Sequence, residues 1–312
     1  MLNETYYEVF TLTEGVCLVV YYFLVAILGS LGNLFVIHAS RSYSSFDLDR
    51  VTVLFVQHLA IADCLKILFM TIPMLTNTLY YMTHPDEFKW YLPYSVGKLS
   101  FFLPGFANNA VSLFIMAVSL HRSARCLIPT RLYQSGDKSA RVVIGIIWFL
   151  APLFCFVVFF LPISYNMRAA LCTMDLTAEM NPILKNLAEY TNYPLAALLV
   201  SIVILANATS LIYTCILTKD HPNTNFRQAN LTVLAISLGM VICYSWLPLQ
   251  IVNVYYPKLN LAASRFTTNM LKFAVPLTTA TSLINPVLYT MVNKGFKKFA
   301  VKVAKRGFNG HS

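Results

Sequence analysis

The chain has 312 residues, of which 57% are hydrophobic and only 12% are charged. The surface of a soluble protein of this length carries more charge than that, so these proportions exclude a water-soluble domain and indicate that lipid surrounds much of the chain. The net charge of +10 would by itself suit a nucleic-acid-binding protein. The basic residues lie mainly in the connections between apolar segments, however, so no nucleic acid is expected as a partner.

Seven apolar stretches follow one another along the chain, and each is long enough to cross a bilayer as a helix of about 20 residues. An eighth stretch, 294–306, is amphipathic: Phe296 and Phe299 share one helical face and lysines fill the other, so it should lie flat on the membrane surface. We predict an all-α membrane protein with one domain, 1–312, that forms a seven-transmembrane helix bundle with a short amphipathic eighth helix. The predicted spans are 15–40, 48–79, 94–127, 139–162, 187–218, 227–256 and 267–291.

The distribution of charge gives the bundle an orientation. With the N-terminus outside, the inner connections and tail hold roughly twice as many lysines and arginines as the outer segments, as the positive-inside rule requires. Residues 1–14 then form an extracellular tail, in which Asn3-Glu4-Thr5 is a glycosylation sequon on Asn3. This tail has no lysine or arginine, so the first span should insert as its own signal. We expect a multi-pass protein of the plasma membrane.

The sequence offers little that would suit catalysis. It has no nucleophile elbow, phosphate-binding loop or HExxH motif, so we expect no enzyme activity, and nothing in it points to a cofactor. The seven cysteines form no CxxC or CxxH pair, which argues against a metal centre. His58, His84 and His121 lie in different regions and share no ligand spacing.

Polar residues inside the apolar spans are the most informative feature, because each is costly in lipid and therefore marks function. In chain order they are Asn33, Asp63, Arg122, Trp148, Trp246-Leu247-Pro248 and Asn285-Pro286-Val287-Leu288-Tyr289. This set resembles the marks of the rhodopsin-like (class A) G-protein-coupled receptors, and the resemblance covers nearly the whole chain. It implies a receptor that transmits an extracellular ligand signal to heterotrimeric G proteins.

Asn33, Asp63 and Asn285 form a predicted polar core between the helices. A buried carboxylate must find hydrogen-bond donors, and the two asparagines can supply them to Asp63. In the family this cluster often holds a sodium ion. Here Val111 and Thr281 stand where the family usually has a serine and an asparagine. A sodium site and a hydrogen-bonded cluster without an ion therefore both remain open.

Arg122, in Ser119-Leu120-His121-Arg122-Ser123, stands where the family has Asp-Arg-Tyr. The resemblance implies that Arg122 reaches the C-terminal helix of the G protein. His121 replaces the acid that normally pairs with the arginine, and Gln228 replaces the second acid of some members. Arg122 thus lacks both usual counter-charges. Either other hydrogen-bond partners hold the arginine, or the inactive state is weakly latched and basal signalling is high; the second interpretation is preferred.

Trp246-Leu247-Pro248 in the sixth span matches the family's Cys-Trp-x-Pro motif. Trp246 and Pro248 would form a hinge, because proline removes a backbone hydrogen bond and allows a kink. The resemblance implies that Tyr213 and Tyr289 meet in the active state. It also assigns a part in activation to Asn285-Pro286.

Cys172, in the second outer loop, lacks its usual partner. The family has a cysteine at the top of the third span, where this chain has Gly97. Cys17 is the other outward candidate, and a Cys17–Cys172 disulfide would need a suitable distance between the two residues. A free thiol at Cys172 is the default expectation.

The ligand pocket should open outward between the helices. Pro104 and Thr279 stand where amine receptors carry an aspartate and opsins carry the retinal lysine, which disfavours both ligand types. Lys66 lies inside the second span; it either binds an anionic group of the ligand or forms an internal ion pair with Asp63. A peptide ligand is favoured, and an anionic small molecule is the second choice. The residues expected to line the pocket are Lys66, Pro104, Asn108, Trp246, Gln250, Asn253 and Thr279.

Two other classes of function remain open. A seven-helix transporter or channel would need polar residues along a path or paired broken helices. A receptor that no longer couples and acts as a scaffold would fit the substitutions at His121, Gly97 and Leu205. Ligand-driven G-protein activation, compared with solute flux in vesicles, separates these classes.

Overall fold

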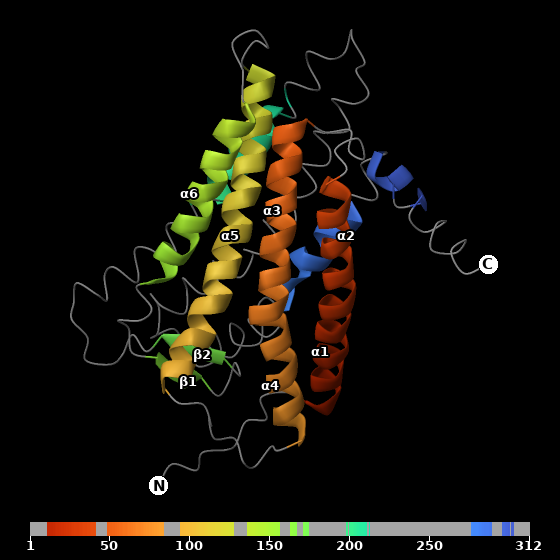
Figure 1. The fold of residues 1–312 in the computed structure, drawn as a ribbon. Coiled ribbons are helices and arrows are strands. Elements are labelled where there is room, and N and C mark those ends of the chain that lie inside the picture. Colours follow the sequence, from red (N-terminus) through yellow and green to blue (C-terminus); the bar gives the residue numbers. More distant parts are fainter. Residues whose placement is uncertain are drawn as a thin grey trace.

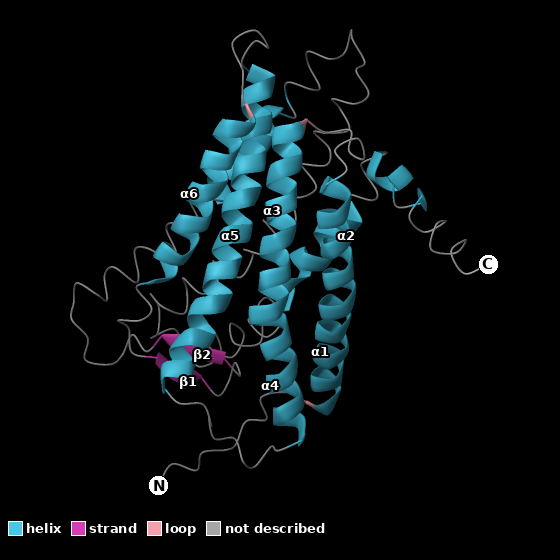
Figure 2. Ribbon diagram, in the orientation of Figure 1, coloured by secondary structure: helices cyan, strands magenta, loops and turns pink. Residues whose placement is uncertain are grey.

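A computed structural model gives the fold as a set of long helices that run side by side (Figure 1). Apart from one short hairpin, the elements that it describes are helical (Figure 2). The predicted sixth span lies outside the described residues, as do the predicted site residues Asn3, Tyr213, Trp246, Pro248, Gln250, Asn253 and Tyr289. The structure describes residues 11–41, 49–83, 94–127, 136–156, 163–166, 171–174, 198, 200–210, 212, 276–288, 295–299 and 301–302.

The first long helix begins at Leu12 rather than at the predicted residue 15. It runs through α1 (Leu12–Leu24), the π-helical turn η1 (Val25–Gly29) and α2 (Ser30–Arg41). Thr11 starts it with a capping box: its hydroxyl accepts from the Glu14 backbone N–H, and the Glu14 carboxylate accepts from the Thr11 N–H. Both backbone donors are thereby satisfied, which explains the earlier start.

The second long helix consists of α3 (Arg50–Lys66), the π-helical turn η3 (Ile67–Thr71) and α4 (Ile72–Thr83). Its N-cap is Asp49, whose carboxylate accepts a hydrogen bond from the backbone N–H of Thr52. An aspartate at this position accepts a hydrogen bond from a free backbone N–H of the first turn. Its negative charge also interacts favourably with the positive end of the helix dipole.

The third and fourth long helices are α5 (Tyr94–Leu127) and α6 (Asp137–Phe156). Strands β1 (Ile163–Asn166) and β2 (Leu171–Met174) follow as an antiparallel hairpin, an element that the sequence prediction did not include. Further helical residues at 200–210, 276–288, 295–299 and 301–302 lie within the predicted fifth, seventh and eighth helices.

The described core surrounds α3, which packs against both α2 and α5. Trp148 of α6 donates through its indole nitrogen to Nδ1 of His58 on α3, at 3.1 Å, and the His58 ring stacks on Phe114 of α5. One aromatic and hydrogen-bonded contact thus joins three helices. The first long helix and α6 also expose large apolar side chains, among them Leu31 of α2 and Phe149 of α6. Three of the described helices are long and apolar enough to cross a membrane, as predicted for a chain surrounded by lipid.

The C-terminal helical residues pack on the first long helix through aromatic rings. Phe296 is buried, and its ring lies edge-on to Phe35 with centroids 5.3 Å apart. Phe299 also contacts Phe35, whereas Lys297 and Lys298 are exposed. This is the division of faces expected of an amphipathic helix at a membrane surface.

Candidate functional site

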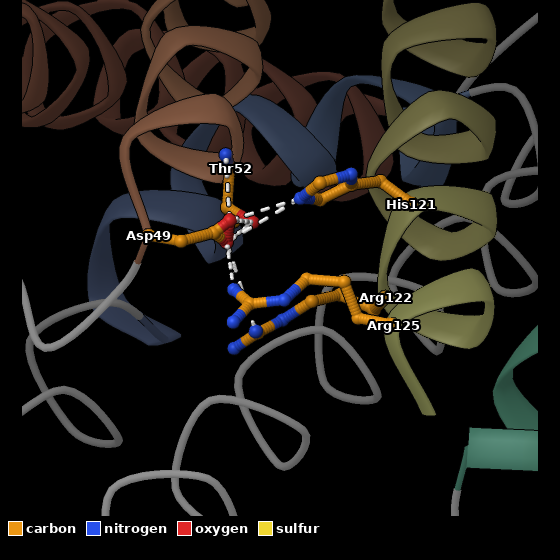
Figure 3. A network of polar contacts seen from close by, with 5 residues as sticks. All are labelled: Asp49, Thr52, His121, Arg122 and Arg125. Atoms are coloured by element: carbon orange, nitrogen blue, oxygen red, sulfur yellow. Dashed lines mark hydrogen bonds and ion pairs between the residues drawn. The ribbon is translucent and has the colours of Figure 1, made fainter. Parts of the chain in front are cut away.

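One carboxylate, that of Asp49, gathers three basic side chains from the end of α5. Figure 3 shows His121, Arg122 and Arg125 pointing at Asp49 from the neighbouring helix. His121 Nε2 lies 2.9 Å from Asp49 Oδ2, and Arg125 Nη1 lies 2.9 Å from Oδ1. Arg122 Nη1 is 3.8 Å from the same Oδ1. We call these four residues the Asp49 cluster.

Local structure explains why the Asp49 cluster forms. As the N-cap of α3, Asp49 is fixed by its own helix, since the Thr52 hydroxyl and backbone N–H both donate to its carboxylate. The start of α3 lies beside the end of α5, which carries His121, Arg122 and Arg125 within little more than one turn (Figures 1 and 3). A helix start that favours negative charge therefore meets a helix end that favours positive charge.

The pKa of Asp49 depends on its burial and on the basic side chains around it. The side chains of His121 and Arg122 are almost fully buried, whereas Arg125 is about one-third exposed. Burial by itself raises the pKa of Asp49. Hydrogen bonds and charge from His121, a hydrogen bond from Thr52 and the Arg122 charge outweigh that effect and hold the pKa well below its usual range. Asp49 is therefore ionised at neutral pH.

Arg122 lacks both usual counter-charges, as the sequence indicates, and a different partner holds it. Neither of the two positions considered in the sequence supplies an acid, but Asp49 of α3 does so from a different helix. An aspartate just before Arg50-Val51-Thr52 is a recognisable helix start. Its approach to a residue more than seventy positions away is not readable from the sequence.

A second group of polar side chains lies inside the bundle around Asp63. Asn285 donates to Asp63 Oδ2 at 2.7 Å, and Ser282 donates to Oδ1 at 3.0 Å. The expected donation from Asn33 to Asp63 is wrong. Asn33 instead donates to the backbone carbonyls of Gly29 and Ser282, which ties the first long helix to residues 276–288. Ser282 is the donor that the sequence reasoning missed.

Close packing holds the same helices together at Gly32. A Cβ atom placed on Gly32 would lie 2.7 Å from Cβ of Pro286, closer than such atoms approach in real structures. Glycine is therefore required for the first long helix to approach residues 276–288. Gly32, Asn33 and Pro286 thus act together in one interhelical contact.

Lys66 is completely buried, and its ammonium group donates to the Thr281 hydroxyl at 3.1 Å. Among the described residues, ion pairs within 4.0 Å are confined to the Asp49 cluster and to Arg50 with Asp137, so Lys66 does not touch Asp63 directly. The direct ion pair considered above is not formed. The Lys66 side chain is also closed off from any ligand in this conformation.

The remaining described pocket candidates are spread over two helices. Pro104 lies within α5, and Asn108, also in α5, is half-buried and accepts a hydrogen bond from Ser112 through its carbonyl. Thr279 is buried beside Tyr21 of α1, with the two hydroxyl oxygens 3.1 Å apart. Thr279 thus faces the first long helix.

Cys17 is an exposed, free thiol in α1. The Cys17–Cys172 disulfide considered above is therefore absent. Cys172 stands opposite Tyr165 in the β1–β2 pairing, which places it in a hairpin rather than on the first long helix.

Comparison with known proteins identifies the family. The family model described as "7 transmembrane receptor (rhodopsin family)" matches residues 32–289. Somatostatin receptor type 2 of Sus scrofa is 24% identical over 311 residues, covering 95% of this chain and 78% of that receptor. Neuropeptide Y receptor type 2 of Bos taurus is 24% identical, with 91% and 74% covered, and a purinoceptor of Xenopus laevis is 25% identical, with 82% and 48% covered.

The match includes the buried polar core around Asp63, Arg122 at the end of α5, and Asn285-Pro286. It extends over well more than half of the chain, and the relatives align over nearly all of it. These are receptors and not enzymes. The chain is therefore a multi-pass membrane protein of the rhodopsin family of seven-transmembrane receptors.

Proposed function

We propose that this receptor binds an extracellular ligand at the plasma membrane and activates a heterotrimeric G protein through Arg122. In this proposal the N-terminus is outside, so that the end of α5 and the start of α3 face the cytoplasm. The observation that carries the proposal is the buried contact of Arg122 with Asp49. A buried arginine held by an acid on another helix can be exposed when the helices move.

The Asp49 cluster would act as a latch for the resting state. While Asp49 holds His121 and Arg122, the arginine stays buried and is kept from a partner protein. Because the acid belongs to α3 and not to α5, release requires the two helix ends to separate or the Arg122 side chain to turn away. Ligand binding would stabilise the released state in proportion to its difference in affinity for the two states.

A peptide is the favoured ligand. Neuropeptide Y receptor type 2 is named for a peptide, and the purinoceptor's name keeps a small organic ligand as the alternative. We propose that the pocket includes Pro104 and Asn108 of α5, together with Trp246, Gln250 and Asn253. The buried contact of Lys66 with Thr281 supports an internal role for Lys66 over contact with the ligand.

The proposal is tested by expressing the chain in cells and screening peptide and metabolite libraries with sensors for several G-protein classes. An Arg122→Ala variant at equal surface level serves as the control. We expect at least one ligand whose response disappears with Arg122→Ala. Ligand-driven solute flux in vesicles, without G-protein activation, would instead establish the transporter or channel alternative. Ligand binding without activation of any G protein would establish a scaffold receptor.

A further inference from the structure

Two opposite charges lie three residues apart on α3, deep in the bundle. Asp63 and Lys66 are both completely buried. Consecutive hydroxyl residues of another helix take up these two charges: Ser282 donates to the Asp63 carboxylate, and Thr281 accepts from the Lys66 ammonium. The carboxylate and the ammonium are thus joined through neighbouring residues of segment 276–288 rather than by direct contact.

A charge inside a membrane protein is costly unless an opposite charge and hydrogen bonds compensate it. Asp63 receives its hydrogen bonds from Ser282 and Asn285, both of which are neutral. Lys66 is a buried basic side chain three residues from Asp63 on α3, and Thr281, the residue before Ser282, binds its ammonium group. With the Asp63 carboxylate ionised and the Lys66 ammonium protonated, the cluster of Asp63, Lys66 and the neutral donors has no net charge.

The same cluster is where the rhodopsin-like family often holds sodium, and the residues here fit that ion poorly. Two buried oxygens, Asn33 Oδ1 and Asn285 Oδ1, accept no hydrogen bond and would suit a cation. The Thr281 hydroxyl is already bound to the Lys66 ammonium, however, and Val111 offers no side-chain oxygen. A sodium ion added beside Lys66 would also leave a buried net charge of one.

We propose that Lys66 is a built-in cation that replaces sodium as the counter-ion of Asp63. Its ammonium compensates the carboxylate and, through Thr281, holds α3 to residues 276–288. The Oδ1 atoms of Asn33 and Asn285, which accept no hydrogen bond, then lie in the electric field of the lysine ammonium instead of that of a sodium ion. The consequence is a receptor whose packing does not depend on sodium, whatever ligand or partner it takes.

Thermal unfolding of the purified full chain tests this proposal without a ligand. The melting temperature is measured in sodium chloride and in choline chloride, each at about 150 mM so that screening is equal. The wild type should melt at the same temperature in both salts. Lys66→Met, which keeps the length of the side chain, should melt roughly 5–10 °C lower in choline and should recover part of the loss in sodium. Lys138→Met, at an exposed position of α6, is the matched control and should behave like the wild type.

A double variant keeps the test decisive if Lys66→Met folds poorly. Asp63→Asn with Lys66→Met removes both charges, so it should be more stable than Lys66→Met alone and should not respond to sodium. Failure of the double variant to exceed Lys66→Met would show that the two charges are not coupled and would overturn the proposal. Stabilisation of the wild type by sodium over choline would also overturn it, as would a Lys66→Met melting temperature that is unchanged and independent of sodium.

Discussion

Replacing Asp49 by asparagine should raise the activity of the receptor in the absence of ligand. Asparagine has almost the same shape and is an equally good N-cap, so α3 should start normally. The negative charge is lost, and the buried Arg122 and His121 keep at most one neutral acceptor in place of a carboxylate. The change therefore isolates the electrostatic part of the latch.

The size of the effect follows from the contacts. A hydrogen bond to a charged group contributes about 1.5–3 kcal/mol, and the asparagine retains part of it. Arg122 lies 3.8 Å away and Arg125 is partly exposed, so their contributions are at the low end. A loss of about 1–2 kcal/mol from the resting state shifts the balance toward the active state by roughly 5- to 30-fold. This is an upper bound, because only contacts broken on activation count.

Basal signalling in cells, normalised to receptor at the surface, measures this shift. Asp137→Asn is the matched control: it removes the partner of Arg50 in an ion pair that is largely exposed, so it should leave basal signalling unchanged. Equal basal signalling of Asp49→Asn and wild type at equal surface level would refute the latch. Equal increases for Asp49→Asn and Asp137→Asn would show a general effect of surface charge instead.

Three further predictions concern single contacts. Adding His121→Asp to Asp49→Asn returns an acid beside the arginine, so basal signalling should fall back toward the wild-type level in the same assay. His121→Asp alone puts two carboxylates roughly 3–4 Å apart, so this single variant should not lower basal signalling. Trp148→Phe removes the indole donor to His58 and should cost about 1–2 kcal/mol, seen as a lower melting temperature; an unchanged temperature would mean that the ring packing alone suffices. Phe296→Ala empties a buried site and should cost about 3–5 kcal/mol, seen as reduced surface expression, whereas normal expression would contradict the packing described.

Much of the helical organisation is predictable because lipid imposes it. Spans must be apolar over about 20 residues, and polar residues within them must find partners. The start of the first helix is also readable from the sequence, since Thr11 and Glu14 form a capping box. The two π-helical turns are not predictable from the sequence, because hydrophobic periodicity does not distinguish a turn with one extra residue from a regular α-helical turn.

The partners of individual polar groups were less predictable, since they depend on how separate helices meet. Asp49 was identifiable as a helix start but not as the partner of Arg122. The sequence predicts the donation from Asn285 to Asp63, whereas the second donor is Ser282 and not Asn33. A lysine inside an apolar span marks Lys66 as unusual, but its contact with Thr281 follows from the packing of α3 on residues 276–288.

The central claim, that Arg122 carries the signal and Asp49 restrains it, is tested most directly without a ligand. The measurement is nucleotide exchange on a panel of purified G proteins, with receptor reconstituted in lipid as wild type, as Asp49→Asn, and as Asp49→Asn combined with Arg122→Ala. Exchange should rise with Asp49→Asn on at least one G protein and fall to the receptor-free rate when Arg122 is also removed. A raised rate that survives Arg122→Ala, or no exchange on any G protein with Asp49→Asn, would contradict the account.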